Sequence, residues 1–284
     1  MRYSLAAIAA IAASVQAHGV VSEIQGANGV TMPGLSVQDG TPRNCASPLC
    51  GSEADTSIIR TREMGGKASA LGRTQGGGAV DAGAAIAMFM GGAGGAGAGA
   101  AAGAKRGFLD ALTGGGAGGA GAASAGTKST GTEGGVAKAA GTGATSGLPT
   151  TADDGTITMT FHQVNQDGAG PLTAQIDATS AGTDPAAFQD ATVMQNVPGI
   201  GIGGLSAAAV KDFPVKVQMP AGMTCSGTAG GATNVCIVRM QNAALAGPFG
   251  GSAAFTQSTA AKKRAVEYNL RKRHMARGIL GKPE

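Results

Sequence analysis

Residues 157–162, Ile-Thr-Met-Thr-Phe-His, alternate between apolar and polar side chains, and this alternation decides the fold class. A period of two places Ile157, Met159 and Phe161 on one face of a β-strand and His162 on the other, threonine-rich face. Other short strand candidates, separated by turn residues, cover residues 20–24, 173–179, 191–197, 213–219 and 235–240. Such a series predicts a mainly β fold, an antiparallel β-sandwich of the immunoglobulin-like kind.

The overall composition fits a folded domain diluted by a low-complexity segment. The 284 residues include 51 Gly, and only 3% are aromatic, but 43% are hydrophobic and the mean hydropathy is close to zero. This hydrophobic content argues against disorder along the whole chain. The glycines have no three-residue period, which excludes collagen. No apolar run reaches the roughly 18–20 residues that a membrane-spanning helix needs.

Residues 1–17 have the pattern of a secretory signal peptide. Arg2 is positively charged, residues 5–15 form an apolar run, and Val15-Gln16-Ala17 is a small-x-small cleavage signal. Cleavage after Ala17 would leave His18 as the first residue of the mature chain. The sequence therefore predicts a secreted protein, either extracellular or associated with the cell wall or surface.

The four cysteines are expected to form two disulfides, because exported thiols tend to oxidise. Spacing favours the local pairs Cys45–Cys50 and Cys225–Cys236, although four cysteines allow three connectivities. A zinc site is the rival interpretation, but no CxxC motif is present to support it.

Composition divides the mature chain into the two parts of a β-sandwich domain, an insertion and a tail. Residues 18–90 and 148–259 contain charges, prolines and apolar runs, and are assigned to the sandwich. Within the first part, residues 80–90 are expected to include a short helix, with Asp81 near its start. Residues 91–147 consist mainly of Gly, Ala, Ser and Thr, so we expect a disordered, flexible insertion.

Residues 260–284 form a basic tail, expected to be partly helical or disordered. The tail contains eight Lys or Arg and two Glu, a net charge of +6, although the whole chain carries only +4. Between leader and tail the chain is acidic, so nucleic-acid binding is not expected of this secreted protein. The tail could be a solvated end, a contact to anionic polymer or a membrane surface, or a peptide processed at its dibasic sites.

Several segments together resemble the secreted Egh-like virulence-factor family of fungi. The similar segments are 18–21 (HGVV), 39–43 (DGTPR), 51–59 (GSEADTSII), 159–171 (MTFHQVNQDGAGP), 195–199 (QNVPG), 212–215 (DFPV), 236–239 (CIVR), 241–242 (QN) and 246–251 (AGPFGG). The resemblance covers most of the mature chain outside the insertion. It implies secretion and a role at the fungal surface during host contact, as in appressorium-forming plant pathogens, and it supplies no established reaction.

An N-terminal His18 also resembles the histidine brace of lytic polysaccharide monooxygenases and of their non-catalytic copper-binding relatives, which are secreted sandwiches. The α-amine and Nδ1 of His18 would give two nitrogen ligands, and His162 would give a third. Square-planar nitrogen ligation suits Cu(II). The resemblance predicts copper as a cofactor, Phe249 as an axial group and Gln241 as a second-sphere partner. Non-catalytic brace proteins use an acidic ligand, and the candidates for that role are Asp153, Asp154, Asp167 and Asp212.

Other chemistries have less support in the sequence. A Ser/His/Asp triad would have to use His162, and no GxSxG motif accompanies it. No spacing singles out a pair of carboxylates for glycoside hydrolysis. His274 lies among Lys and Arg in the tail and is interpreted as a solvated residue.

Three functions remain open, and whether the protein is an enzyme is undecided. The first is a fungal surface protein that binds copper through His18 and His162. The second is a copper monooxygenase acting on cell-wall glycans, although the body between leader and tail lacks the Trp or Tyr that usually bind sugar faces. The third is a metal-free structural or interaction protein. Cell-wall polysaccharide or a host surface are the candidate partners.

Overall fold

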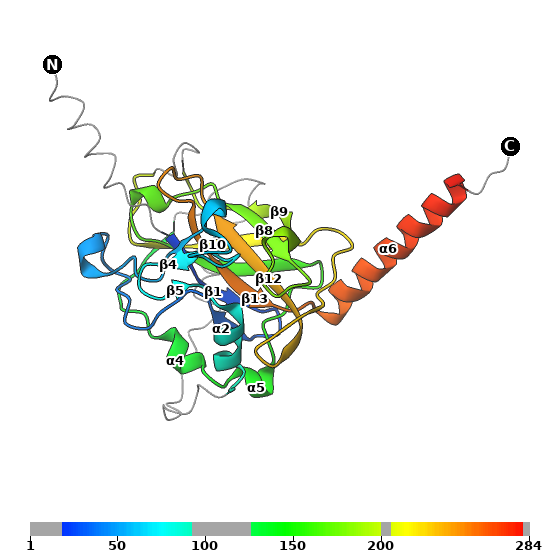
Figure 1. Ribbon diagram of the computed structural model, residues 1–284, viewed down its shortest axis with the longest axis horizontal. Coiled ribbons are helices and arrows are strands. Elements are labelled where there is room, and N and C mark those ends of the chain that lie inside the picture. Colours follow the sequence, from blue (N-terminus) through cyan, green and yellow to red (C-terminus); the bar gives the residue numbers. More distant parts are fainter. Residues whose placement is uncertain (1–18, 93–125, 200–205, 281–284) are drawn as a thin grey trace, which may run out of the picture.

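The computed structural model describes residues 19–92, 126–199 and 206–280. The predicted signal peptide, 1–17, and His18 lie outside these residues. The described chain is built mainly from antiparallel strands, with a helix leaving the body at the C-terminal end (Figure 1). The mainly β fold predicted from the alternating segments is confirmed.

The strands follow one hydrogen-bonded path, β2-β1-β7-β10-β9-β8-β12-β13-β3-β4-β5, which curls into a half-barrel. In that order they are β2 (Thr31–Pro33), β1 (Gly19–Gln25), β7 (Thr156–Gln163), β10 (Lys211–Gln218), β9 (Phe188–Gln195), β8 (Thr173–Asp177), β12 (Ala232–Gln241), β13 (Phe249–Phe255), β3 (Ser57–Ile58), β4 (Arg73–Thr74) and β5 (Gly78–Ala79). Off this path, β6 (Thr127–Lys128) pairs with β10 and β11 (Gly227–Ala229) with β12. Strand β9 joins the two curled halves of the sheet. Its first residues, Phe188–Ala191, pair with β8, and its last residues, Thr192–Gln195, pair with β10.

The helices are few and mostly short. They are α2 (Ala82–Phe89), α4 (Gly135–Ala139), α5 (Gly143–Ser146) and α6 (Thr259–Leu280), with single 3-10 turns at Pro48–Cys50, Thr61–Glu63, Gln166–Gly168 and Pro185–Ala187. Helix α2 begins where the sequence predicts, because the Asp81 carboxylate accepts the N–H of Ala84 at 3.0 Å and caps the first turn.

The core lies between the two curled halves of the sheet. The alternating runs of β7 and β10 are direct neighbours, with Phe213 opposite Phe161 and Val215 opposite Met159. Both apolar faces therefore point the same way, into the core, where these side chains are fully buried. Burial of each such side chain contributes about 1.5–3 kcal/mol.

Strand β13 is a strand that the alternation rule does not detect. Its sequence, Phe-Gly-Gly-Ser-Ala-Ala-Phe, is buried at every position. A Cβ on Gly250 would lie 1.9 Å from the carbonyl oxygen of Met240, and one on Gly251 would lie 2.7 Å from the amide nitrogen of Val21. Because the backbones of β12 and β1 both approach β13 closely, this strand needs small residues rather than the β-branched residues typical of strands.

The predicted insertion is shorter than its boundaries of 91–147 indicate. Residues 93–125 lie outside the described residues, but 126–147 contribute β6, α4 and α5 to the fold. Long-range contacts hold this part in place: Thr127 pairs with Asp212 of β10, and the Asp39 carboxylate accepts the N–H groups of Val136 and Ala137 at 2.9 and 2.7 Å. The boundary at 147 is therefore corrected, since composition alone does not reveal such contacts.

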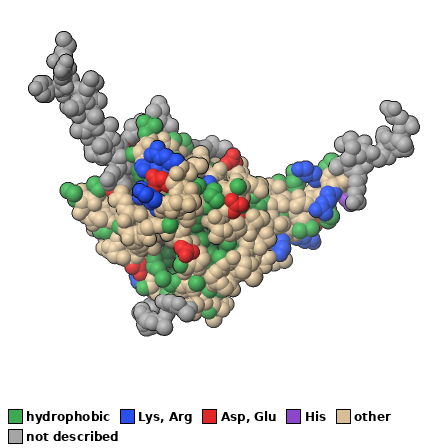
Figure 2. Space-filling view, viewed as in Figure 1, with side chains coloured by type: hydrophobic (Ala, Val, Ile, Leu, Met, Phe, Trp, Pro, Cys, Tyr) green, Lys and Arg blue, Asp and Glu red, His purple; other side chains and the backbone are tan. Residues whose placement is uncertain are grey.

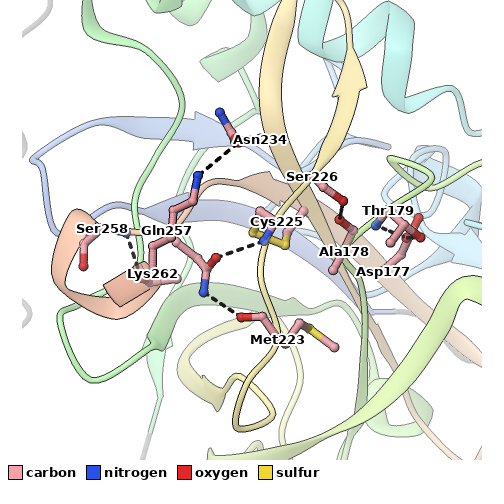
Figure 3. The surroundings of a disulfide bond; sticks show 12 residues. Asp177, Ala178, Thr179, Met223, Cys225, Ser226, Asn234, Gln257, Ser258 and Lys262 are labelled. Atoms are coloured by element: carbon pink, nitrogen blue, oxygen red, sulfur yellow. Dashed lines mark hydrogen bonds between the residues drawn. A yellow bond between two sulfur atoms is a disulfide. The ribbon is translucent and has the colours of Figure 1, made fainter. Parts of the chain in front are cut away.

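Both disulfides join the pairs that the spacing favours, Cys45–Cys50 and Cys225–Cys236. The second bond lies in the core beside the start of α6 (Figure 3). There, Gln257 accepts the N–H of Cys225 and donates to the carbonyl oxygen of Met223, both at 2.9 Å. The disulfide loop and the root of α6 thus support each other.

The turn after β8 is organised by the buried carboxylate of Asp177. It accepts the N–H groups of Thr179, Ser180 and Gly182 at 2.8, 2.9 and 2.6 Å, as well as the Ser180 hydroxyl. Burial alone would raise the pKa of Asp177, but the hydrogen bonds, that of the Ser180 hydroxyl foremost, outweigh it and lower the pKa.

Replacing Asp177 with Asn is expected to cost about 1–3 kcal/mol of unfolding free energy at pH 7, because the amide cannot accept all four bonds. A carboxyl with a lowered native pKa stabilises the fold above its ordinary pKa of 3.8, and this stabilisation is lost as the pH falls through the lowered value. Urea unfolding from pH 7 to pH 2 should therefore show a smaller acid-induced loss for Asp177→Asn than for wild type. Asp190→Asn, at an exposed carboxylate, is the control, and equal acid-induced losses for all three proteins would contradict the prediction.

The basic tail forms helix α6 through Leu280, which agrees with the predicted helical content. Ser258 caps its first turn, because the hydroxyl oxygen accepts the N–H of Ala261 at 3.1 Å. Helix α6 runs away from the body, and Lys and Arg side chains are visible along it (Figures 1 and 2). No helix among the described residues is both long and apolar enough to cross a membrane.

Candidate functional site

The candidate site lies at the end of β7, next to the start of β1. His162 is the penultimate residue of β7, and it lies directly opposite Val20 of β1. The side chain is completely buried, although it lies on the threonine-rich face of its strand. It is buried because Ser129, which directly follows β6, and the start of β10 cover this end of the strand.

One ring nitrogen of His162 is held by a carboxylate. Nδ1 lies 2.7 Å from Oδ1 of Asp212, which sits directly across from His162 on β10. The Ser129 hydroxyl donates to the other carboxylate oxygen at 2.7 Å, and its oxygen lies 3.1 Å from Nδ1. An ionised carboxylate can only accept hydrogen bonds, so the proton must be on Nδ1. The Nε2 lone pair of a neutral ring is then free for another partner.

The Nε2 atom is the unusual feature of this site. It is buried and has no hydrogen-bond partner among the described residues. A buried polar atom without a partner costs about 1–3 kcal/mol, so such atoms in native proteins call for an explanation. A histidine held at one nitrogen by a carboxylate, with the other nitrogen open, has the arrangement typical of metal ligands.

Asp212 remains ionised in this setting. Burial alone would raise the pKa of Asp212, but the hydrogen bonds from His162 and the Ser129 hydroxyl, together with the nearby Arg43 charge, outweigh it and lower the pKa. The carboxylate therefore acts as an acceptor that fixes the tautomer and the orientation of the ring.

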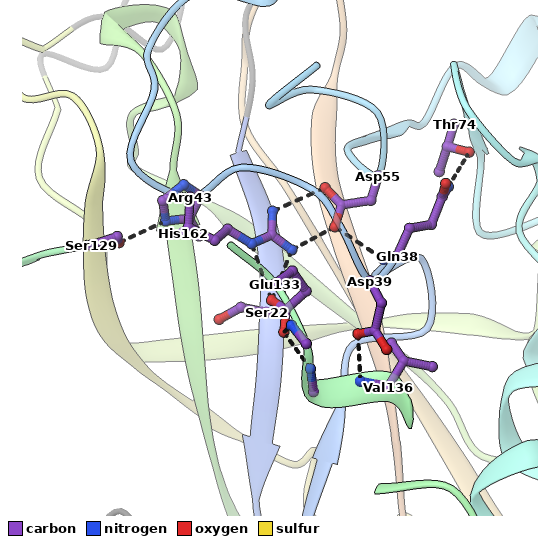
Figure 4. A network of polar contacts seen from close by, with 12 residues as sticks. Ser22, Gln38, Asp39, Arg43, Asp55, Thr74, Ser129, Glu133, Val136 and His162 are labelled. Carbon is purple, nitrogen blue, oxygen red and sulfur yellow. Dashed lines mark hydrogen bonds and ion pairs between the residues drawn. The ribbon is translucent and has the colours of Figure 1, made fainter. Parts of the chain in front are cut away.

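A buried ion-pair network adjoins the histidine (Figure 4). Arg43 donates to both oxygens of the Asp55 carboxylate, at 3.0 and 2.5 Å, and to Glu133 at 3.1 Å. Asp55 is completely buried and Arg43 nearly so. Burial alone would lower the pKa of Arg43, but the two carboxylates outweigh it and raise the pKa, so the guanidinium stays charged.

The other predicted site residues have different places. Phe249 is buried at the start of β13, in a small apolar cluster with Ile58 and Ala244. Gln241 ends β12 opposite Gly250, and its side chain makes no hydrogen bond within the described part of the chain. The roles assigned to both residues stay predictions.

The four acidic candidates separate clearly. Asp212 reaches His162, as described above. Asp153 accepts the Ser258 hydroxyl at the root of α6, and Asp154 accepts the N–H of Thr156. Asp167 lies in the 3-10 turn after β7, where its carbonyl oxygen accepts the Asn242 amide. Of the four, only Asp212 therefore contacts the histidine.

The arrangement is not a catalytic triad. In a triad the serine contacts the histidine nitrogen opposite the one that the aspartate holds. Here Ser129 and Asp212 both lie at Nδ1. The described residues also contain no group of three or more His, Cys, Asp or Glu that could hold a metal, and His18 lies outside the described residues. A brace that uses His18 is therefore untested by this observation.

A separate apolar cavity of about 380 Å³ lies between β2, α2 and α4. Its walls are mostly Met, Val, Ala and Phe side chains, and none of the predicted site residues lines it. The cavity and the histidine site are therefore different features of the molecule.

Sequence reasoning identified His162 and included Asp212 among four acidic candidates, but it did not single out Asp212 as the partner of the histidine. In β10, Asp212 precedes the core residue Phe213 and lies on the other face of the strand. In β7, His162 follows the core residue Phe161 and also lies on the other face. This matching pattern was a signal, but it becomes informative only once β7 and β10 are known to be neighbours. Ser129 and Glu133 carried no signal, because they lie within the segment assigned to the insertion.

Taken together, the fold and the site define a disulfide-bonded antiparallel β protein with a buried histidine–aspartate pair beside its first strand. A family model described as Egh16-like virulence factor matches residues 16–250. The chain belongs to this Egh16-like virulence factor family, as the resemblance of its segments predicted.

Two relatives come from the fungus Pyricularia oryzae. Appressoria-specific virulence factor GAS2 is 59% identical over 282 residues, covering 98% of this chain and 97% of that protein. Appressoria-specific virulence factor GAS1 is 39% identical over 129 residues, covering 44% of this chain and 50% of that protein. No solved structure matches the chain.

Proposed function

We propose that this protein is a secreted virulence factor of the fungal surface that binds copper through His18 and His162. The observation that carries the copper proposal is the open, buried Nε2 of His162, with Nδ1 fixed by Asp212. The virulence role is supported by the similarity to the two appressoria-specific virulence factors. Secretion is supported by the signal-peptide pattern and by two disulfides, which persist in oxidising compartments.

The start of strand β1 supports a ligand role for an N-terminal His18. Val20 lies directly opposite His162, and β1 begins at Gly19. Two residues of extended chain span at most about 7 Å, so the proposed ligand His18 needs to bridge only a short length of chain to reach His162. The α-amine, Nδ1 of His18 and Nε2 of His162 would together provide the three nitrogens that suit Cu(II).

The residues present fit a bound copper ion. Asp212 holds the His162 ring in one orientation and keeps the proton on Nδ1, so the lone pair of Nε2 faces the ligand position. Ser129 holds the second oxygen of Asp212 and so fixes the carboxylate. When bound, copper would supply a redox-active ion. Phe249 and Gln241 remain the proposed axial and second-sphere residues.

No observation on the described residues favours a glycan monooxygenase over a copper-binding protein. The large apolar side chains exposed on the described body are Leu49, Met88, Met194 and Leu245, and none is aromatic. Flat sugar surfaces are usually bound by aromatic side chains, which combine apolar area with a polar edge. Copper binding without a known reaction is therefore the function that the geometry supports best.

The test is a copper titration of the secreted, processed protein, together with its intact mass. We expect a chain beginning at His18, one copper per chain and a nitrogen-rich paramagnetic resonance spectrum. Adding one alanine before His18 removes the free amine as a ligand, and should weaken binding by more than the roughly 100-fold that loss of an outer-sphere partner can cost. A mature chain beginning at another residue, or equal copper affinity of the extended protein, would refute the brace.

A further inference from the structure

Helix α6 is anchored to the body only at its root. Ser258 donates to Asp153 at 2.9 Å, Ala261 and Ala265 are buried, and Asn269 donates to the carbonyl oxygen of Gly222 at 2.9 Å. Among the described side chains, none after Asn269 makes a hydrogen bond or an ion pair to the body. The last part of the helix, Leu270–Leu280, therefore stands free in solvent, as Figure 1 shows.

The helix concentrates positive charge. Between residues 262 and 277 it has seven Lys or Arg and a single acidic residue, Glu267, over about 22 Å of helix axis. In the free part, Arg271, Lys272 and Arg273 are exposed and make no ion pair with any described residue. Three adjacent cations repel one another, although they interact favourably with the helix C-terminus. A polyanion would relieve this repulsion.

The exposed apolar residues of α6 do not form one face. Val266 and Leu270 are four residues apart and lie on one side of the helix. Tyr268 and Met275 lie close to the opposite side, because two residues advance a helix by about half a turn. All four are 45% exposed or more. A helix that inserts into a lipid surface needs a continuous apolar face, so this pattern disfavours a membrane as the partner.

We propose that the free part of α6, Leu270–Leu280, binds a linear acidic polysaccharide outside the cell. Clusters of Lys and Arg are typical of segments that bind nucleic acid or heparin-like polyanions. The two disulfides indicate an oxidising, extracellular setting, and a carboxylated polysaccharide is an extended polyanion that suits such a setting. The excess charge lies all around a projecting rod, so one polymer chain can run along it without contacting the acidic body. This proposal does not depend on copper binding.

The test uses the mature full-length protein and polygalacturonate as the probe. The variant Arg271→Gln/Lys272→Gln/Arg273→Gln removes three charges, and glutamine keeps nearly the same helix propensity. For wild type, the logarithm of the affinity should fall linearly with the logarithm of the salt concentration. The variant should bind roughly tenfold or more weakly at low salt and show a shallower slope, because fewer counterions are released.

A matched control separates the helix from overall charge. Arg62→Gln/Lys67→Gln/Lys138→Gln removes three exposed charges from the body and should bind like wild type. If this control weakens binding as much as the helix variant, net charge alone is responsible and the proposal is wrong. Absence of wild-type binding would also overturn it, as would tighter binding to anionic phosphatidylserine vesicles than to polygalacturonate.

A second variant covers the case in which neutralisation unfolds the helix. Circular dichroism reports the helix content of the triple variant. A chain that ends at Asn269 keeps every observed contact of α6 with the body, so the body should remain folded. The truncated protein should lose polygalacturonate binding, and undiminished binding by it would overturn the proposal.

Discussion

Replacing His162 with Gln is expected to abolish specific copper binding by the mature protein. The substitution removes the open Nε2 and the Nδ1 that Asp212 holds at 2.7 Å. Loss of this ligand should weaken copper binding by more than the roughly 100-fold associated with loss of an outer-sphere partner. The measurement is a competitive copper titration with paramagnetic resonance of the bound ion.

The same experiment has a graded partner and a control. Asp212→Ala keeps Nε2 but releases the ring, so it should weaken binding by about 10–100-fold. His274→Ala removes an exposed histidine on α6 and should leave binding unchanged. Near-ultraviolet circular dichroism checks that the buried substitutions leave the fold intact. Copper affinity unchanged in a folded His162→Gln protein would leave the metal-free alternative as the better account.

Replacing Asp55 with Asn is expected to lower the free energy of unfolding by about 3–5 kcal/mol, because it leaves the buried Arg43 charge with only one carboxylate. Asp55 accepts two hydrogen bonds from that guanidinium and one from the N–H of Gln38 at 3.2 Å. The neutral amide can replace neither the charge nor both acceptors. Urea unfolding of the disulfide-intact protein at pH 7 measures the loss.

Asp39→Asn is the matched control for Asp55→Asn. Asp39 lies in the same segment between β2 and β3, but it is exposed and accepts the backbone N–H groups of Val136 and Ala137 instead of a buried guanidinium. Asn caps helices about as well as Asp, so this change should cost a few tenths of a kcal/mol. A double variant, Arg43→Met/Asp55→Leu, should lose less stability than Asp55→Asn, because both members of the most buried pair are removed together. Glu133 loses its partner Arg43, but it is partly exposed and still accepts the N–H groups of Gly134 and Gly135. Equal losses for the two aspartate variants would contradict a buried ion pair.

The sequence predicted the strands whose side chains alternate, and it missed the strand that obeys a different constraint. Strands β7 and β10 were predicted correctly because one side of each strand faces the core, which produces the alternation. Strand β13 is buried all round and limited by close backbone approach at Gly250 and Gly251, so its small residues resemble a loop. Periodicity reports burial on one face, and it cannot report this kind of packing.

Only the part of the site that has a local sequence pattern was predicted. A mature N-terminal histidine and a strand histidine can be recognised locally, and they pointed to His18 and His162. The partners of His162 are 33 and 50 residues away along the chain, at Ser129 and Asp212. Ser129 also lies in a stretch whose composition matches that of the predicted insertion. Only the pairing of β10 with both β6 and β7 brings these residues together.

The pairing of strand β9 with both halves of the curled sheet determines how the protein can unfold. In a sandwich of two separate sheets, one layer can detach while its own hydrogen bonds stay intact. Here one strand serves both layers, because β9 pairs through Phe188–Ala191 with one and through Thr192–Gln195 with the other. One layer can therefore detach only if the hydrogen bonds that β9 makes to β8 or to β10 are broken. We therefore expect the strands of the body to unfold together in one cooperative transition.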